Sequence, residues 1–224
     1  MPINAPAELA QWSAAAPNSA WAPHLLPGKP ATRYDTVRRD GRWLLHAQAH
    51  SSASMLRRPL AVNVSDIGRL RYSWQVPALI PRADLTQRDT EDSPVRVVLA
   101  FDGDHDKLSL RNQSLFDLAQ LLTGERPPYA TLMYVWENRA APESVIINPR
   151  TDRIRKIVAE SGSKRLGQWL DYERDIVTDY RRAFGEEPGR LIGVAIMTDT
   201  DNTQTDIDAW YGEITLLSAG GERL

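Results

Sequence analysis

Oxygen-bearing side chains gather in one stretch near the end of the chain, residues 198–208, which holds four aspartates and an asparagine. Carboxylate and amide oxygens are the ligands that Ca²⁺ prefers in proteins. We therefore expect Asp199 and Asp201, with Glu213 from the following strand, to be candidate ligands of a calcium ion. The stretch is not an EF-hand, because the sixth position from Asp199 is Gln204 rather than glycine and the twelfth is Trp210 rather than glutamate.

The same acidic loop supports two other interpretations. Its side chains could satisfy backbone groups in tight turns and so hold the loop itself. They could also contact an organic ligand directly. The candidate ligand-binding residues are Arg96, Trp136, Trp169, Asp199, Asp201, Asn202 and Trp210.

Arg96 lies within the apolar run 95–101, where an unpaired charge would be costly. If its side chain faces the interior, it needs a carboxylate partner, and Asp199, Asp201 and Glu213 are the candidates. We therefore hypothesise that Arg96 pairs with one of these acids and holds the acidic loop in place. The alternative is that Arg96 lies on the solvent face of a half-exposed strand.

Tryptophan is frequent, with seven residues against three phenylalanines. Exposed indole rings can stack on the flat faces of sugars. Trp136 lies in an apolar run and is more typical of a core residue, whereas Trp169 and Trp210 border loops and are better candidates for an exposed surface. A basic series (Arg150, Arg153, Arg155, Lys156, Lys164 and Arg165) fits a solvated face, or a contact with an anionic polysaccharide or lipid head group.

Short β-strands must position these residues. Alternating or apolar runs predict strands at 33–37, 43–49, 51–56, 60–64, 70–76, 95–101, 131–136, 153–159, 169–176, 191–197 and 209–217. Helices are expected at 114–123 and 176–184, each followed by a glycine that can end it. Asp40-Gly41 predicts a hairpin turn, and 77–94 reads as a long polar loop. No βαβ rhythm appears, so we predict an all-β, mostly antiparallel jelly-roll sandwich with two or three short inserted helices. Residues 1–31 are expected to be an irregular N-terminal extension and 32–220 a single β-sandwich domain.

Composition restricts the function further. The chain has 224 residues, a net charge of −2 and no cysteine, so thiolate chemistry and disulfides are excluded and no basic face for nucleic acid is indicated. No apolar run is long enough to cross a bilayer. Phosphate-loop, dinucleotide-binding, zinc-protease and nucleophile-elbow motifs are absent from the sequence.

Several segments together resemble the bacterial domain-of-unknown-function family 3047. They include Leu70 to Val76, Asp92 to Val97, Phe184 to Pro188, and the most specific pair, Asp199-Thr200-Asp201-Asn202-Thr203 with Tyr211-Gly212-Glu213-Ile214. The family's usual aromatic residue and alanine are replaced by Ser93 and Val95. The resemblance implies no catalytic residues, since the family has no assigned activity, and its members usually look exported. More distantly, the closing pattern is similar to galactose-binding-like jelly-roll domains, which often bind carbohydrate.

We therefore expect noncatalytic binding of a carbohydrate or cell-envelope glycan, near the acidic loop and the 77–94 loop. A polysaccharide hydrolase or lyase that uses paired acidic residues and a structural envelope protein are the alternatives. The expected location is the periplasm or outside the cell if a signal peptide was removed, and the cytoplasm otherwise, because residues 1–21 lack the features of such a peptide.

Overall fold

A computed structural model describes residues 8–10 and 20–223, which fold mainly into β-strands. The strands are β1 (Glu8–Ala10), β2 (Ala22–Leu25), β3 (Arg33–Arg39), β4 (Arg42–His50), β5 (Ala53–Val62), β6 (Arg69–Gln75), β7 (Ser93–Phe101), β8 (Ala130–Glu137), β9 (Val145–Ile147), β10 (Ile154–Ser161), β11 (Trp169–Asp175), β12 (Leu191–Asp199) and β13 (Asp206–Leu217). The α-helices are α1 (Leu110–Thr123) and α2 (Ile176–Phe184), and short 3₁₀ turns occupy Val64–Asp66, Arg88–Thr90 and His105–Lys107.

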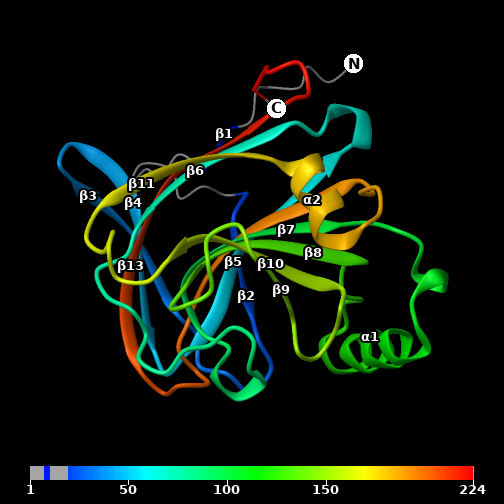
Figure 1. Cartoon of the computed structure of the whole chain (residues 1–224), viewed down its shortest axis with the longest axis horizontal. Helices are drawn as coiled ribbons and strands as arrows, with labels where there is room; N and C mark the ends of the chain where they lie inside the picture. Colours follow the sequence, from blue (N-terminus) through cyan, green and yellow to red (C-terminus); the bar gives the residue numbers. More distant parts are fainter. Residues whose placement is uncertain (1–7, 11–19, 224) are drawn as a thin grey trace.

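The strands form two sheets that pack face to face (Figure 1). Sheet A has the order β11-β6-β13-β4-β3, with β1 also paired to β13, and sheet B has the order β2-β5-β12-β7-β8-β10-β9. The described pairs are antiparallel apart from β8 with β10. Strands β4, β5, β6 and β7 alternate between the sheets, and so do β12 and β13. This winding makes the fold a jelly-roll β-sandwich, as predicted.

Alternation along each strand builds the core between the sheets. Leu70, Tyr72 and Trp74 of β6 point inward, and Tyr134 and Trp136 of β8 meet them from sheet B. All five side chains are at most 2% exposed. The alternate residues of the same strands form the two outer faces of the sandwich.

Turn and helix-end predictions are confirmed. Asp40 and Gly41 both have positive φ, 51° and 78°, which is the conformation of a two-residue hairpin turn between β3 and β4. Helix α2 has the predicted bounds. Helix α1 begins four residues earlier than predicted, at a Ser109 cap whose hydroxyl accepts from the backbone N–H of Asn112. Gly124 and Gly185 end the two helices in the left-handed conformation.

Two details differ from the sequence prediction. The segments 51–56 and 60–64 belong to one strand, β5, because Pro59 falls beside a register shift in its pairing with β12 and needs no ladder hydrogen bond there. Residues 8–10 and 22–25, predicted as irregular, add β1 to sheet A and β2 to sheet B. The rest of the predicted extension up to residue 19 lies outside the described residues.

Irregular chain covers part of the outer face of sheet B. The connection from β6 to β7 folds over it, and Leu85 from this connection packs with Val98, Met133 and Val135 in a second, smaller core. Among the described residues, no helix is long and apolar enough to cross a membrane.

Candidate functional site

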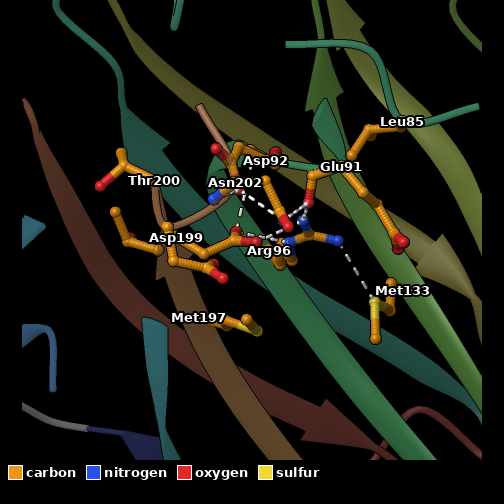
Figure 2. Close-up of polar contacts among 12 residues, drawn as sticks. Leu85, Glu91, Asp92, Arg96, Met133, Met197, Asp199, Thr200 and Asn202 are labelled. Carbon is orange, nitrogen blue, oxygen red and sulfur yellow. Dashed lines mark hydrogen bonds and ion pairs between the residues drawn. The ribbon is translucent and has the colours of Figure 1, made fainter. Parts of the chain in front are cut away.

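Arg96 lies on the outer face of sheet B and is 2% exposed. Its Nε and Nη2 atoms donate to the two carboxylate oxygens of Asp199, at 2.8 and 2.7 Å, and Nη2 also donates to the Glu91 carbonyl at 2.9 Å (Figure 2). Asp199 is the last residue of β12, the strand next to β7. The predicted pairing of Arg96 with an acid of the loop is therefore confirmed, and the solvent-facing alternative is excluded.

A second buried ion pair lies beside the first. Lys156 of β10 is 0% exposed, and its ammonium group lies 2.6 Å from Glu91 Oε1 and donates to the Leu85 carbonyl at 3.1 Å. Asn148 donates to the same Glu91 oxygen at 2.6 Å, and Arg150 donates to the other oxygen at 2.9 Å. The expectation that the whole basic series lies on a solvated face is thus wrong for Lys156. Its ion pair ties the β6–β7 connection to sheet B.

Burial dominates the electrostatics of these two pairs. It raises the pKa of Asp199 to about 6, although the charge and hydrogen bonds of Arg96 act in the opposite direction. It lowers the pKa of Lys156 to about 8, with the charge of Arg96 adding to this effect and Glu91 opposing it. Both pairs therefore carry a desolvation cost that their close geometry must offset.

The carboxylates of the acidic loop converge only in part. Oxygens of Asp92, Asp199 and Asp201 lie within 4.8 Å of one another. Each already has a protein partner, since Asp201 pairs with Lys29, Asp199 with Arg96, and Asp92 accepts from Asn202 and from the amide and hydroxyl of Thr203. Lys29 and Arg96 offset the charges of Asp201 and Asp199, and the hydrogen bonds to Asp92 hold the short 200–205 loop against the β6–β7 connection.

Glu213 is not part of this group. Its half-exposed side chain lies in sheet A, with Arg223 3.9 Å away. The structure therefore does not bring Asp199, Asp201 and Glu213 together, and Asp92, which the sequence did not single out, takes the third place. Asp92 and Asp199 are only 1% and 2% exposed, so this pair of acids is shielded from a polysaccharide chain.

The predicted tryptophans occupy three different environments. Trp136 is in the core, 1% exposed, and donates to the Gly162 carbonyl at 3.1 Å, so its inclusion among the ligand-binding residues is wrong. Trp210 is half-buried on the outer face of sheet A, where its ring stacks on His46 with centroids 4.8 Å apart and the Arg39 guanidinium lies 5.4 Å from its centre. The ring of Trp210 is therefore engaged by neighbouring side chains.

Trp169 instead borders a hollow of about 920 Å³ on the outer face of sheet A. Trp43, which the sequence analysis did not select, borders the same hollow and is 38% exposed. Polar side chains complete the lining, among them Arg42, Arg71, Asp171, Glu173 and Glu213. The sequence signal for this site would have been Trp43 and Trp169, two tryptophans near the starts of strands whose side chains alternate between the core and solvent.

An irregularity in β13 creates the hollow. β13 pairs with β4 only as far as Tyr211 opposite Leu45, and its register with β6 shifts between Tyr211 and Ile214. Gly212 lies in this shift, and a Cβ atom there would come within 2.1 Å of the Ser73 hydroxyl and 3.6 Å of the Trp169 ring. Glycine therefore lets the Ser73 hydroxyl lie close against β13.

Charges around the hollow are partly paired. Glu173 accepts from Arg69 at 2.7 Å and from Arg71 at 2.5 Å, and these hydrogen bonds lower the pKa of its carboxyl group. The hollow therefore presents two aromatic side chains beside ordered polar groups, a combination that can contact both an apolar face and hydroxyl groups of one ligand.

Comparison with known sequences decides the family. The sequence profile described as "Protein of unknown function (DUF3047)" matches residues 19–215. The chain belongs to this family. No curated protein matches it.

The two most specific motifs of this DUF3047 chain divide between the two outer faces. Asp199 to Thr203 builds the ionic cluster on sheet B, and Tyr211 to Ile214 builds the irregularity beside the hollow on sheet A. Tyr211 connects them through the core, because its hydroxyl donates to the Met197 carbonyl at 2.7 Å and lies 2.8 Å from the Thr198 hydroxyl. The β12–β13 connection, which crosses from sheet B to sheet A, thus links the geometry of both regions.

Solved structures similar to this DUF3047 chain share little sequence with it. The family 11 carbohydrate-binding module of the cellulosomal cellulase Lic26A-Cel5E of Clostridium thermocellum is 9% identical, with a TM-score of 0.43 over 89% of this chain and 88% of that chain. The xyloglucanase domain of NopAA, a type three effector from Sinorhizobium fredii, in complex with cellobiose, is also 9% identical. Its TM-score is 0.45 over 88% of this chain and 92% of that chain. Likenesses at this level carry no argument about function.

Proposed function

We propose that this domain binds a carbohydrate without transforming it, in the hollow on the outer face of sheet A. The observation that carries the proposal is the pairing of Trp43 and Trp169 around a hollow of about 920 Å³ whose remaining lining is largely polar. The volume falls in the range of small-molecule sites, roughly 300–1,000 Å³. The ligand class would be a glycan, including one of the cell envelope, and a periplasmic or extracellular location forms part of the proposal.

The physical argument rests on the two surfaces of a sugar ring. Its C–H face is apolar and gains from contact with an indole ring, whereas its hydroxyl edge needs hydrogen-bond partners when water is removed. Trp169 and Trp43 offer the first kind of contact, and Asp171, Glu213 and Arg42 offer the second. The hollow needs no movement of the β6–β7 connection, which lies over sheet B.

Binding is tested by screening the wild-type domain on a glycan array and measuring the best ligand by calorimetry. We expect Trp169→Ala and Trp43→Ala each to weaken binding at least about tenfold, which corresponds to about 1.4 kcal/mol. The matched control is Trp210→Phe, which changes a tryptophan on the same face outside the hollow lining and should leave the affinity unchanged.

Two results would overturn the proposal. One is a wild-type domain that binds no glycan on the array or in solution. The other is a glycan whose affinity survives both substitutions in the hollow. Release of new reducing ends from the bound polysaccharide would instead show that the domain is catalytic.

A further inference from the structure

A second hollow lies on the opposite side of the molecule, between α1 and the outer face of sheet B. Its volume is about 660 Å³. The floor is made of small side chains on adjacent strands, Ala100 of β7 with Gly193 and Ala195 of β12, and Phe116 of α1 and Met133 of β8 form walls. We call this hollow the helix groove.

Helix α1 does not fill the helix groove. Figure 1 shows the helix at the side of sheet B, and only Asn112 and Phe116 among its fourteen residues are buried. Its leucines 118, 121 and 122 point to solvent and are 53%, 82% and 69% exposed. The second core under Leu85 covers the neighbouring part of the same sheet face, so the space under α1 is a gap in the apolar covering of sheet B.

The charges at the rim of the helix groove are compensated. Arg57 makes two hydrogen bonds to Glu125, at 2.6 and 3.0 Å, and Asp102 accepts from Arg190 at 2.9 Å. Arg126 lies 3.9 Å from Asp117. A charged ligand would find no uncompensated partner among these described groups, so the rim favours an uncharged one.

One polar atom in the wall lacks a partner. The Nδ1 atom of His105 is buried and has no hydrogen bond to any part of the chain that the structure describes. Its ring lies edge-on to Phe116 and Tyr129, with centroids 6.0 and 5.9 Å away. Burial, aided by the charge of Arg126, lowers the pKa of His105, which keeps the imidazole neutral. A neutral imidazole nitrogen can exchange a single hydrogen bond with a hydroxyl or carbonyl group.

We propose that the helix groove is a binding site for an uncharged, mainly hydrocarbon molecule that carries one hydroxyl or carbonyl oxygen, such as a long-chain alcohol. The hydrocarbon part covers Ala100, Ala195 and Met133, and the oxygen reaches Nδ1 of His105, which is covered in the structure, after a turn of the imidazole ring. This site is independent of the glycan site, because the two hollows open on opposite outer faces of the sandwich.

The test uses the fluorescence of 1-N-phenylnaphthylamine on the whole protein, followed by displacement with 1-decanol or with decanoate. We expect saturable probe binding, displacement by decanol, and much weaker displacement by the charged decanoate. Ala100→Phe and Ala195→Leu place extra carbon atoms in the groove, and each should lower the probe affinity about tenfold or more. The melting curve of each filling variant shows whether it folds. If one of the two folds poorly, the other supplies the result.

Leu121→Ser is the control for adsorption to the exposed leucines of α1, and it should bind the probe like the wild type. His105→Phe should weaken displacement by decanol about three- to tenfold, the value of one hydrogen bond, while the probe affinity stays the same. The proposal is overturned if the wild type shows no saturable binding, if both filling variants bind normally, if Leu121→Ser abolishes binding, or if decanoate competes as well as decanol.

Discussion

An arginine in a strand of sheet B and one in a strand of sheet A differ strongly in how much of the side chain is exposed. Arg96 in sheet B is 2% exposed and holds Asp199 with two hydrogen bonds, whereas Arg71 in sheet A holds the Glu173 carboxylate with its side chain 57% exposed. The difference is the covering, since the β6–β7 connection lies over Arg96 and supplies Glu91 to Lys156 beside it. The buried charges of sheet B fix the β6–β7 connection in place, whereas the polar residues on the outer face of sheet A stay exposed to solvent.

The largest expected effect comes from breaking the covered pair. Arg96→Met leaves the Asp199 carboxylate buried without its partner, and we expect a loss of about 3–5 kcal/mol in the free energy of unfolding, measured with urea. Arg71→Met is the matched control on the other face, where loss of a solvent-screened pair with Glu173 should cost far less. Equal losses in the two variants would remove the distinction between the faces.

A smaller effect should appear as a pH dependence of stability. Burial lowers the pKa of Lys156 to about 8 from 10.5, so between these values the unfolded chain holds more protons than the folded protein. Stability from this group is therefore complete above about pH 10.5 and is lost as the pH falls through 8. Between pH 7.5 and 10 the wild type should gain up to about 2 kcal/mol relative to Lys156→Met, measured by urea unfolding.

Lys164 provides the control for this pH series, because it is an exposed lysine of the same chain. Lys164→Met should follow the wild-type curve across the whole range. A Lys156→Met curve that runs parallel to the wild type would show that the buried ammonium group titrates as it does in the unfolded chain.

The smallest expected effect concerns calcium. Asp199 and Asp201 already pair with Arg96 and Lys29, so a cation would have to displace internal partners. We expect the melting temperature to be the same with calcium and with a chelator. A clear rise with calcium would mean that the native state binds the ion, and it would turn the acidic loop into a ligand site.

Much of the fold could be predicted from local patterns. Periodicity identified the strands, and Gly124 and Gly185 marked the ends of the helices. The cost of a charge within an apolar run meant that a buried Arg96 would need a carboxylate, and its partner was among the three acids named. These inferences concern short-range patterns or a single strong energetic requirement, which one sequence contains.

The rest depended on long-range register. Lys156 looked solvated because Arg153 and Arg155 precede it, and nothing local indicates that Glu91 will reach it from a loop between two other strands. Trp43 and Trp210 look alike in the sequence, yet one borders the hollow and the other stacks on His46. The register shift of β13 at Gly212 decides which of the two borders the hollow. This shift can be recognised only from the pairing of β13 with β6.

The position of β12 and β13 in the sheets has a consequence for how the chain folds. These last two strands lie in the interior of both sheets, where β12 separates β5 from β7 and β13 separates β4 from β6. Neither sheet is complete until β12 and β13 have paired. Their pairings with β4 and β5 join segments far apart along the chain. Such non-local contacts make folding slow, and a chain emerging from the ribosome keeps four strand edges open until β12 and β13 are released.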